Sequence, residues 1–185
     1  MKLRSRALQL GAALALCSLA GACTQPSAPQ EPTATPTPAS TSPSETQLER
    51  QTRLDFEAAE KAYLAFKSEY ARVAMAGGTN RATEAMRATA AGPYLKVMTD
   101  FLSQTKAAGK RQEGEVRIAY VRRGAYSPQQ LNLDVCEDGT RVRNVTSDGH
   151  VSKGIVAEVT LYLRPVDGHW KLWDGDDKKV AACKK

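Results

Sequence analysis

Few side chains in this sequence have the chemistry of a catalytic centre. Its two histidines, His150 and His169, each follow a glycine in a segment typical of a turn. No Gly-x-Ser-x-Gly, Walker or dinucleotide-binding motif is present. Asp174, Asp176 and Asp177 could supply carboxylate ligands to a cation, although an exposed acidic turn followed by two lysines is the simpler interpretation. We therefore expect no catalytic residues, no metal site and no cofactor.

The first 22 residues have the layout of an export signal. Three basic residues lie within the first six, and the uncharged stretch at 7–20 is shorter than a membrane-spanning helix requires. The sequence Leu-Ala-Gly-Ala-Cys at 19–23 resembles a bacterial lipobox whose aliphatic residue lies one place early. The resemblance implies that residues 1–22 are a signal peptide and that Cys23 is lipidated. The alternative is an ordinary secretory signal with a spare cysteine.

A tether rich in Pro, Ser and Thr follows at 24–45. It contains six of the nine prolines and no large apolar residue, so it cannot build a core. In an extended polyproline conformation it would span about 70 Å. Without the signal the chain keeps 23 basic and 20 acidic residues, and this mild net charge argues against nucleic acid as a partner. We expect the extracytoplasmic face of the cell membrane as the location, with membrane lipid bound through Cys23.

Two cysteines, Cys136 and Cys183, remain in the domain after the signal is removed and Cys23 is acylated. An even pair in an oxidising compartment predicts a disulfide. The bond would close a loop of about 48 residues and stabilise the fold by roughly 4 kcal/mol in the chain-entropy model. No Cys-x-x-Cys motif is present, which makes a redox pair the weaker interpretation.

The single domain that we expect at 46–185 begins with helices. Apolar side chains recur every three to four residues from about Thr46, and this pattern predicts a long amphipathic helix that ends at Gly77-Gly78. A short helix is expected at about 81–90. A third helix is expected to begin after residue 92, with a proline in its first turn, and to stop near residue 109.

The second half of the domain has the pattern of antiparallel strands. Apolar alternation predicts strands at 116–121, 131–135 and 155–163. Asp138-Gly139 is a hairpin signal, so we expect residues 141–145 to return beside the preceding strand. Helices followed by strands predict an α+β fold, with N-terminal helices packed on a curved antiparallel sheet of about four strands.

The segment from Val159 to Asp174 resembles the last hairpin of nuclear transport factor 2-like (cystatin-like) domains. A long strand, an Asp-Gly turn and the sequence His-Trp-Lys-Leu-Trp-Asp carry the resemblance. It covers about 47–185 and implies a cone-like half-barrel, trimmed because a strand pair between the early helices is missing. Small exported actinobacterial lipoproteins often look like this. The resemblance carries over no catalytic set.

Some enzymes of this fold family use one Asp or His with a Tyr inside the cone, and this chain has four tyrosines at candidate pocket positions: Tyr63, Tyr70, Tyr94 and Tyr120. The carboxylates nearest in pattern, Asp100 and Asp134, cannot be assigned to the interior. The aromatic and methionine stripe of the third predicted helix could line a ligand pocket, although packing in the core is the more common role of such a stripe.

These patterns favour a membrane-anchored lipoprotein with a non-catalytic binding or accessory domain in the cell envelope. Its partner would be a small apolar ligand or an envelope protein. The alternatives are a cone-type isomerase, dehydratase or hydrolase, and a phage-borne envelope interaction protein. An enzyme needs a buried Asp or His beside a pocket Tyr, and a binding cone needs an apolar cavity. An interaction module needs a filled cone and an exposed apolar sheet face.

Overall fold

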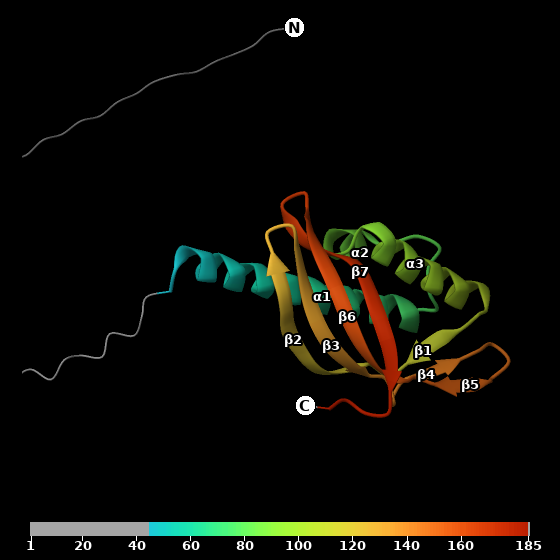
Figure 1. Ribbon diagram of the computed structural model, residues 1–185. Helices are drawn as coiled ribbons and strands as arrows, with labels where there is room; N and C mark the ends of the chain where they lie inside the picture. Colours follow the sequence, from blue (N-terminus) through green and yellow to red (C-terminus); the bar gives the residue numbers. More distant parts are fainter. Residues whose placement is uncertain (1–44, 185) are drawn as a thin grey trace, which may run out of the picture. The chain divides into compact units, whose positions relative to one another are not determined.

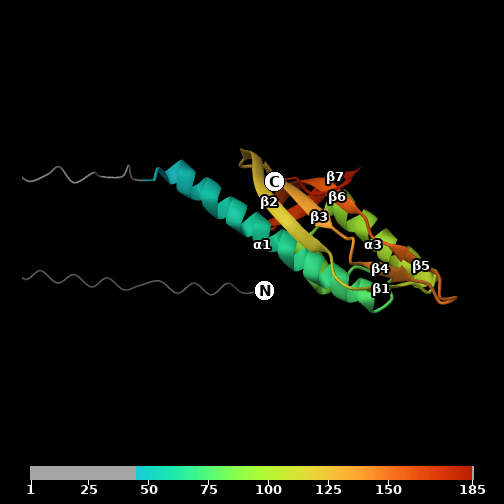
Figure 2. The ribbon, with the colours of Figure 1, turned by 90° about the horizontal axis from the view of Figure 1, so that it is seen from below.

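The computed structural model describes residues 45–184, which form three helices followed by seven strands. The helices lie against one face of a curved antiparallel sheet, and this confirms the predicted α+β class (Figures 1 and 2). The expected signal, the lipidated Cys23 and nearly all of the tether lie outside the described residues. Within 45–184, no helix is both long enough and apolar enough to cross a bilayer.

Helix α1 (Gln47–Met75) is the long amphipathic helix that the sequence predicts. Thr46 caps it, because its hydroxyl accepts from the Glu49 backbone N–H while the Glu49 carboxylate accepts from the Thr46 N–H. The glycine pair ends it, since Gly78 has a φ of +83° and donates its N–H to the Val73 carbonyl. A Cβ on Gly78 would lie 2.2 Å from the Leu102 carbonyl oxygen, so only glycine fits.

Two further helices complete the cover of the sheet. Helix α2 (Glu84–Thr89) is a single short element, capped by the hydroxyl of Thr83. Helix α3 (Gly92–Ala107) carries its proline in the first turn, as expected. Both helices contact the last strand of the main sheet, so the helical layer follows the curve of that sheet.

The main sheet contains strands β2 (Arg117–Ser127), β3 (Gln130–Asp138), β6 (Val156–Val166) and β7 (His169–Val180), in that spatial order. Its helix-facing side is the core, where the leucines of β3, β6 and β7 have no exposed surface. The expected Asp-Gly turn joins β6 to β7, with both Asp167 and Gly168 at positive φ. The four strands agree with the predicted number for the sheet that faces the helices.

A second, three-stranded sheet corrects one expectation. Strands β1 (Arg111–Glu113), β4 (Arg143–Val145) and β5 (Val151–Lys153) pair in the order β1-β4-β5. The predicted return of residues 141–145 beside β3 is therefore wrong. Strand β3 already has β2 on one edge and β6 on the other, so neither edge is free for a returning strand.

Strand β2 contains a β-bulge that reverses the facing of its side chains. Ile118 pairs with Glu137 and Tyr120 pairs with Cys136, so Ala119 is an extra residue opposite a single step of β3. Ile118 therefore shares the helix-facing side with Glu137. Tyr120 shares the opposite, outer face with Cys136.

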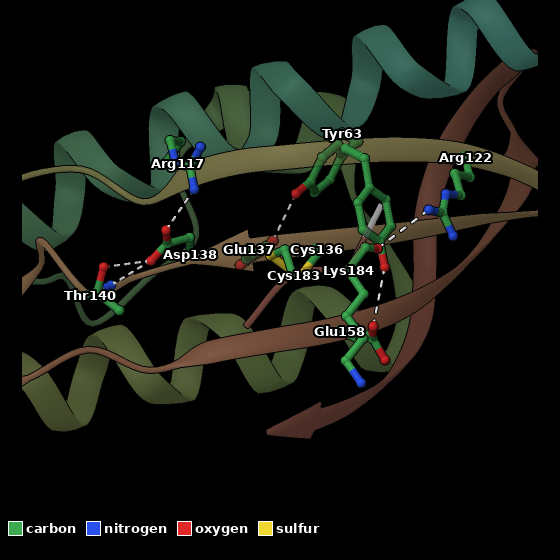
Figure 3. The surroundings of a disulfide bond; sticks show 11 residues. Tyr63, Arg117, Arg122, Cys136, Glu137, Asp138, Thr140, Glu158, Cys183 and Lys184 are labelled. Carbon is green, nitrogen blue, oxygen red and sulfur yellow. Dashed lines mark hydrogen bonds and ion pairs between the residues drawn. A yellow bond between two sulfur atoms is a disulfide. The ribbon is translucent and has the colours of Figure 1, made fainter. Parts of the chain in front are cut away.

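The predicted disulfide joins Cys136 to Cys183 with a Cα–Cα distance of 5.8 Å. It ties the C-terminal tail to the outer face of β3, beside Glu158 of β6 (Figure 3). The hydrophobic core consists of residues between Phe56 and Leu172. A chain that begins at residue 24 therefore keeps the whole core and the disulfide.

Candidate functional site

A cavity of about 590 Å³ opens between the helices and the helix-facing side of the main sheet. Its apolar wall comes from α3, from strand β6 and from the segments on either side of β4 and β5. The apolar residues of that wall are Val97, Met98, Phe101, Val142, Ile155, Ala157 and Val159. The volume lies within the range of pockets that hold small organic ligands. The cone therefore contains open space that its own side chains do not fill.

Glu137 is the one shielded carboxylate of the cavity lining, and each of its oxygens accepts a hydrogen bond. The Tyr63 hydroxyl donates to Glu137 Oε1 at 2.8 Å (Figure 3), and Lys67 Nζ donates to Oε2 at 2.7 Å. The side chains of Lys67 and Glu137 are 15% and 17% exposed, so the ion pair is largely shielded from water. Charge-assisted bonds of this kind compensate part of the cost of taking two charges out of water.

Two tyrosines of the cavity wall keep their hydroxyls free. Burial, followed by the negative charge of Glu137, raises the pKa values of Tyr70 and Tyr94, so both are neutral phenols at pH 7. Within residues 45–184 neither hydroxyl has a hydrogen-bond partner in the protein, and neither hydroxyl oxygen is fully buried. Both hydroxyls can therefore donate a hydrogen bond to a molecule in the cavity.

The structure brings together three of the four predicted pocket tyrosines. Tyr70 and Tyr94 line the cavity, and Tyr63 lies behind its floor with its hydroxyl on Glu137. Tyr120 does not reach the cavity, because the bulge turns it to the outer face. There it donates to Glu158 at 3.3 Å, and the Arg122 guanidinium lies 4.2 Å from its ring centroid.

Lys67 and Glu137 are functional candidates that the sequence analysis missed. On β3 the helix-facing positions are Leu131, Leu133 and Val135, and the next position in that alternation is Glu137. A charge that continues an apolar alternation marks an inward-facing carboxylate. Lys67 follows Tyr63 by four residues on α1, which places it above the same face of the helix.

The remaining polar candidates lie elsewhere. His150 is exposed in the turn between β4 and β5, and His169 is exposed at the start of β7. The acidic residues 174–177 belong to strand β7 rather than to the expected turn. Asp176 accepts from Tyr162, whereas Asp177 pairs with Val159 and so borders the cavity. Among the residues that the structure describes, no group of three or more His, Cys, Asp or Glu side chains could hold a metal ion.

A second hollow of about 410 Å³ lies beside the cavity, between α1 and the start of β2. It shares Lys67, Tyr70 and Val116 with the cavity, but Glu137 and Tyr94 do not line it. We place the candidate site in the larger cavity, because the ion pair and both free phenols meet there.

Comparison with solved structures places this architecture among known folds. A protein from Novosphingobium aromaticivorans named as an aromatic ring hydroxylase matches with a TM-score of 0.50 and 11% identity, over 70% of this chain and 92% of that one. The fold is nuclear transport factor 2-like. No family model and no curated protein matches the sequence.

Two other solved structures match with lower scores. The intermembrane-space region of the chloroplast protein ARC6 has a TM-score of 0.47 at 14% identity, covering 67% of this chain and 96% of that one. A protein from Streptomyces avermitilis named as a dehydratase of the NTF2-like family has a TM-score of 0.44 at 13% identity, covering 70% and 99%. At such identities the likeness concerns the fold alone, and function has to be argued from the cavity.

Proposed function

We propose that this chain is a membrane-anchored lipoprotein of the cell envelope whose domain acts as a non-catalytic binding module. The small apolar ligand of this module would occupy the cavity between α3 and the main sheet. The lipid anchor on Cys23 and the tether at 24–45 would hold the domain at the extracytoplasmic face of the membrane.

One observation carries the binding part of the proposal, namely an open, largely apolar cavity whose one shielded carboxylate is already held by an ion pair and a hydrogen bond. A general base needs an accessible lone pair within reach of the proton that it removes. Tyr63 and Lys67 each hydrogen-bond one oxygen of Glu137, so protonation of this carboxylate would break its ion pair with Lys67. The open space also favours a ligand over a pure interaction role, for which a filled cone would be expected.

The cavity can be tested with a neutral apolar dye, N-phenyl-1-naphthylamine, whose fluorescence rises when it leaves water. The variant Val159→Trp would fill the cavity from its β6 wall. Thr160→Trp is its matched control, since the next residue of a strand points to the opposite face. The proposal predicts a saturable signal for the parent chain and Thr160→Trp, and loss of that signal in Val159→Trp. Equal signals in all three proteins would refute binding in the cone.

The anchor is tested separately, by phase partitioning in a detergent that separates on warming. The exported chain should enter the detergent phase, and Cys23→Ser should move it to the aqueous phase, because acyl chains supply the membrane affinity. Intact mass should show a chain that starts at residue 23 and carries the added lipid. A parent chain that stays in the aqueous phase would contradict the anchor and leave the cavity proposal intact.

A cone-type acid–base enzyme is the second candidate, and the contact between Glu137 and Tyr63 is the observation that favours it. A carboxyl group beside a phenol inside a cone could move a proton if Lys67 swung away. Glu137→Gln keeps the shape of the side chain but removes the base. The enzyme account replaces the binding account if the parent chain converts a bound ligand and Glu137→Gln binds the same ligand without converting it.

A further inference from the structure

Polarity is distributed in the cavity in an unusual order, with the polar groups at the floor and the apolar groups at the rim. The floor holds the Lys67–Glu137 pair and the free phenols of Tyr70 and Tyr94. Three residues of the lining are large, apolar and exposed, namely Val97 at 49%, Phe101 at 52% and Ile155 at 47%. A compact apolar ligand would leave this rim uncovered and the phenol donors unpaired.

We propose, building on the ligand-binding function above, that the cavity takes a single-chain amphiphile with its neutral, hydrogen-bond-accepting head at the floor and its tail across the rim. The phenols of Tyr70 and Tyr94 donate to the head. Val97, Phe101 and Ile155 cover the tail where it leaves the cone.

The charge of the lining decides between head groups. Lys67 is the only basic residue that lines the described cavity, and Glu137 already engages it. Glu137 is the shielded carboxylate of the lining, whereas Asp174, Asp176 and Asp177 are exposed. A carboxylate or phosphate head at the floor would therefore leave water without a free cation to pair with. A cationic head would find no unpaired carboxylate at the floor, because Glu137 is already paired with Lys67. A neutral ester, carbonyl or hydroxyl head accepts from the phenols without either penalty.

The rim points to a ligand longer than the cavity. Exposed apolar side chains scattered singly are ordinary, whereas several that border one opening mark a binding surface. Val97 and Phe101 are one helical turn apart on α3, and Ile155 precedes β6. The tail of a bound amphiphile would lie between these elements. On a domain tethered to the membrane, this arrangement leaves the far end of the tail free to remain in the bilayer.

The experiment compares three probes that share an eight-carbon chain: 1-monooctanoylglycerol, octanoate and octyltrimethylammonium, all below their micelle-forming concentrations. Each is titrated into the isotope-labelled chain from residue 24 onward, and binding is followed by amide chemical shifts of the cavity residues. The neutral probe should bind at least about five-fold more tightly than either ion, which corresponds to one net hydrogen bond. Octanoate or octyltrimethylammonium binding as tightly as the neutral probe would overturn the proposal.

Two pairs of variants test the orientation. Tyr94→Phe should weaken the neutral probe about five-fold, whereas Tyr162→Phe, the same change on the outer face, should leave it unaltered. Phe101→Ser should weaken it about five- to ten-fold, whereas Leu54→Ser, at a comparable exposure of 44% on α1, should not. Tyr70→Phe replaces Tyr94→Phe if the latter does not fold. No loss in the phenol and rim variants would reject this binding mode. No cavity shifts with any probe would reject the binding function itself.

Discussion

The disulfide offers a prediction whose size follows from the structure. Replacing Cys136 and Cys183 together with alanine opens a loop with a sequence separation of 47 residues. The chain-entropy model assigns such a loop about 4 kcal/mol. With an unfolding entropy of about 2.1 cal/mol/K per residue over the described domain, this loss lowers Tm by about 14 °C. Cys136 has no exposed surface, so its truncation to alanine also removes packing contacts and lowers the stability further.

The assay is thermal unfolding of the oxidised parent and the double variant, followed by circular dichroism at equal concentration. Urea unfolding adds a second readout, because the open chain exposes more surface and should unfold with a steeper dependence on denaturant. Ligand binding should not change, since the bond lies on the outer face of β3 and the cavity on the inner face. A Tm difference below about 3 °C would refute the reasoning, because the tail would then constrain the unfolded chain very little.

Two further predictions concern charges. Lys67→Met leaves the shielded Glu137 carboxylate with Tyr63 as its remaining partner. This change should lower the free energy of unfolding by about 2 kcal/mol, which is less than the loss expected for a fully buried ion pair. In urea titrations the double variant Lys67→Met/Glu137→Leu should recover most of that loss, and additive losses would show that the pair is not coupled. Hydrogen bonding to Arg72 lowers the pKa of Glu69 from 4.5 to about 2, so its contribution to stability is present above pH 4.5 and fades as the pH falls towards 2. Glu69→Gln should therefore have a lower free energy of unfolding than the parent near pH 7, and the difference should close towards pH 2. A difference that does not change with pH would contradict this assignment.

Local patterns in the sequence predicted most of the helices and the main sheet. Helix α1 was recoverable because its cap, its stripe and its terminal glycines agree with one another. The turn between β6 and β7 was recoverable because Asp-Gly favours the positive φ values that this turn requires. The second sheet was missed because β1, β4 and β5 each span only three residues, too few for an alternating pattern to stand out.

The candidate site was only partly predictable, and the reasons are physical. Tyr120 continues the alternation of its strand, and only the bulge at Ala119 sends it to the outer face. A bulge depends on the register between two strands, which one strand's sequence does not specify. Glu137 and Lys67 are 70 residues apart in the chain, and their contact arises only when α1 crosses the curved sheet. The stripe of α3 serves both expected roles, because Tyr94, Met98 and Phe101 line the cavity, whereas Leu102 is buried in the core and Leu95 packs against it.

The central claim is that the cone holds a ligand, and native mass spectrometry of the full chain purified from its own membranes tests it most directly. The account predicts a one-to-one complex with a neutral amphiphile, present in the parent chain and in Thr160→Trp and absent from Val159→Trp. A ligand-free spectrum for the parent chain under conditions that preserve its folded charge states would contradict the claim.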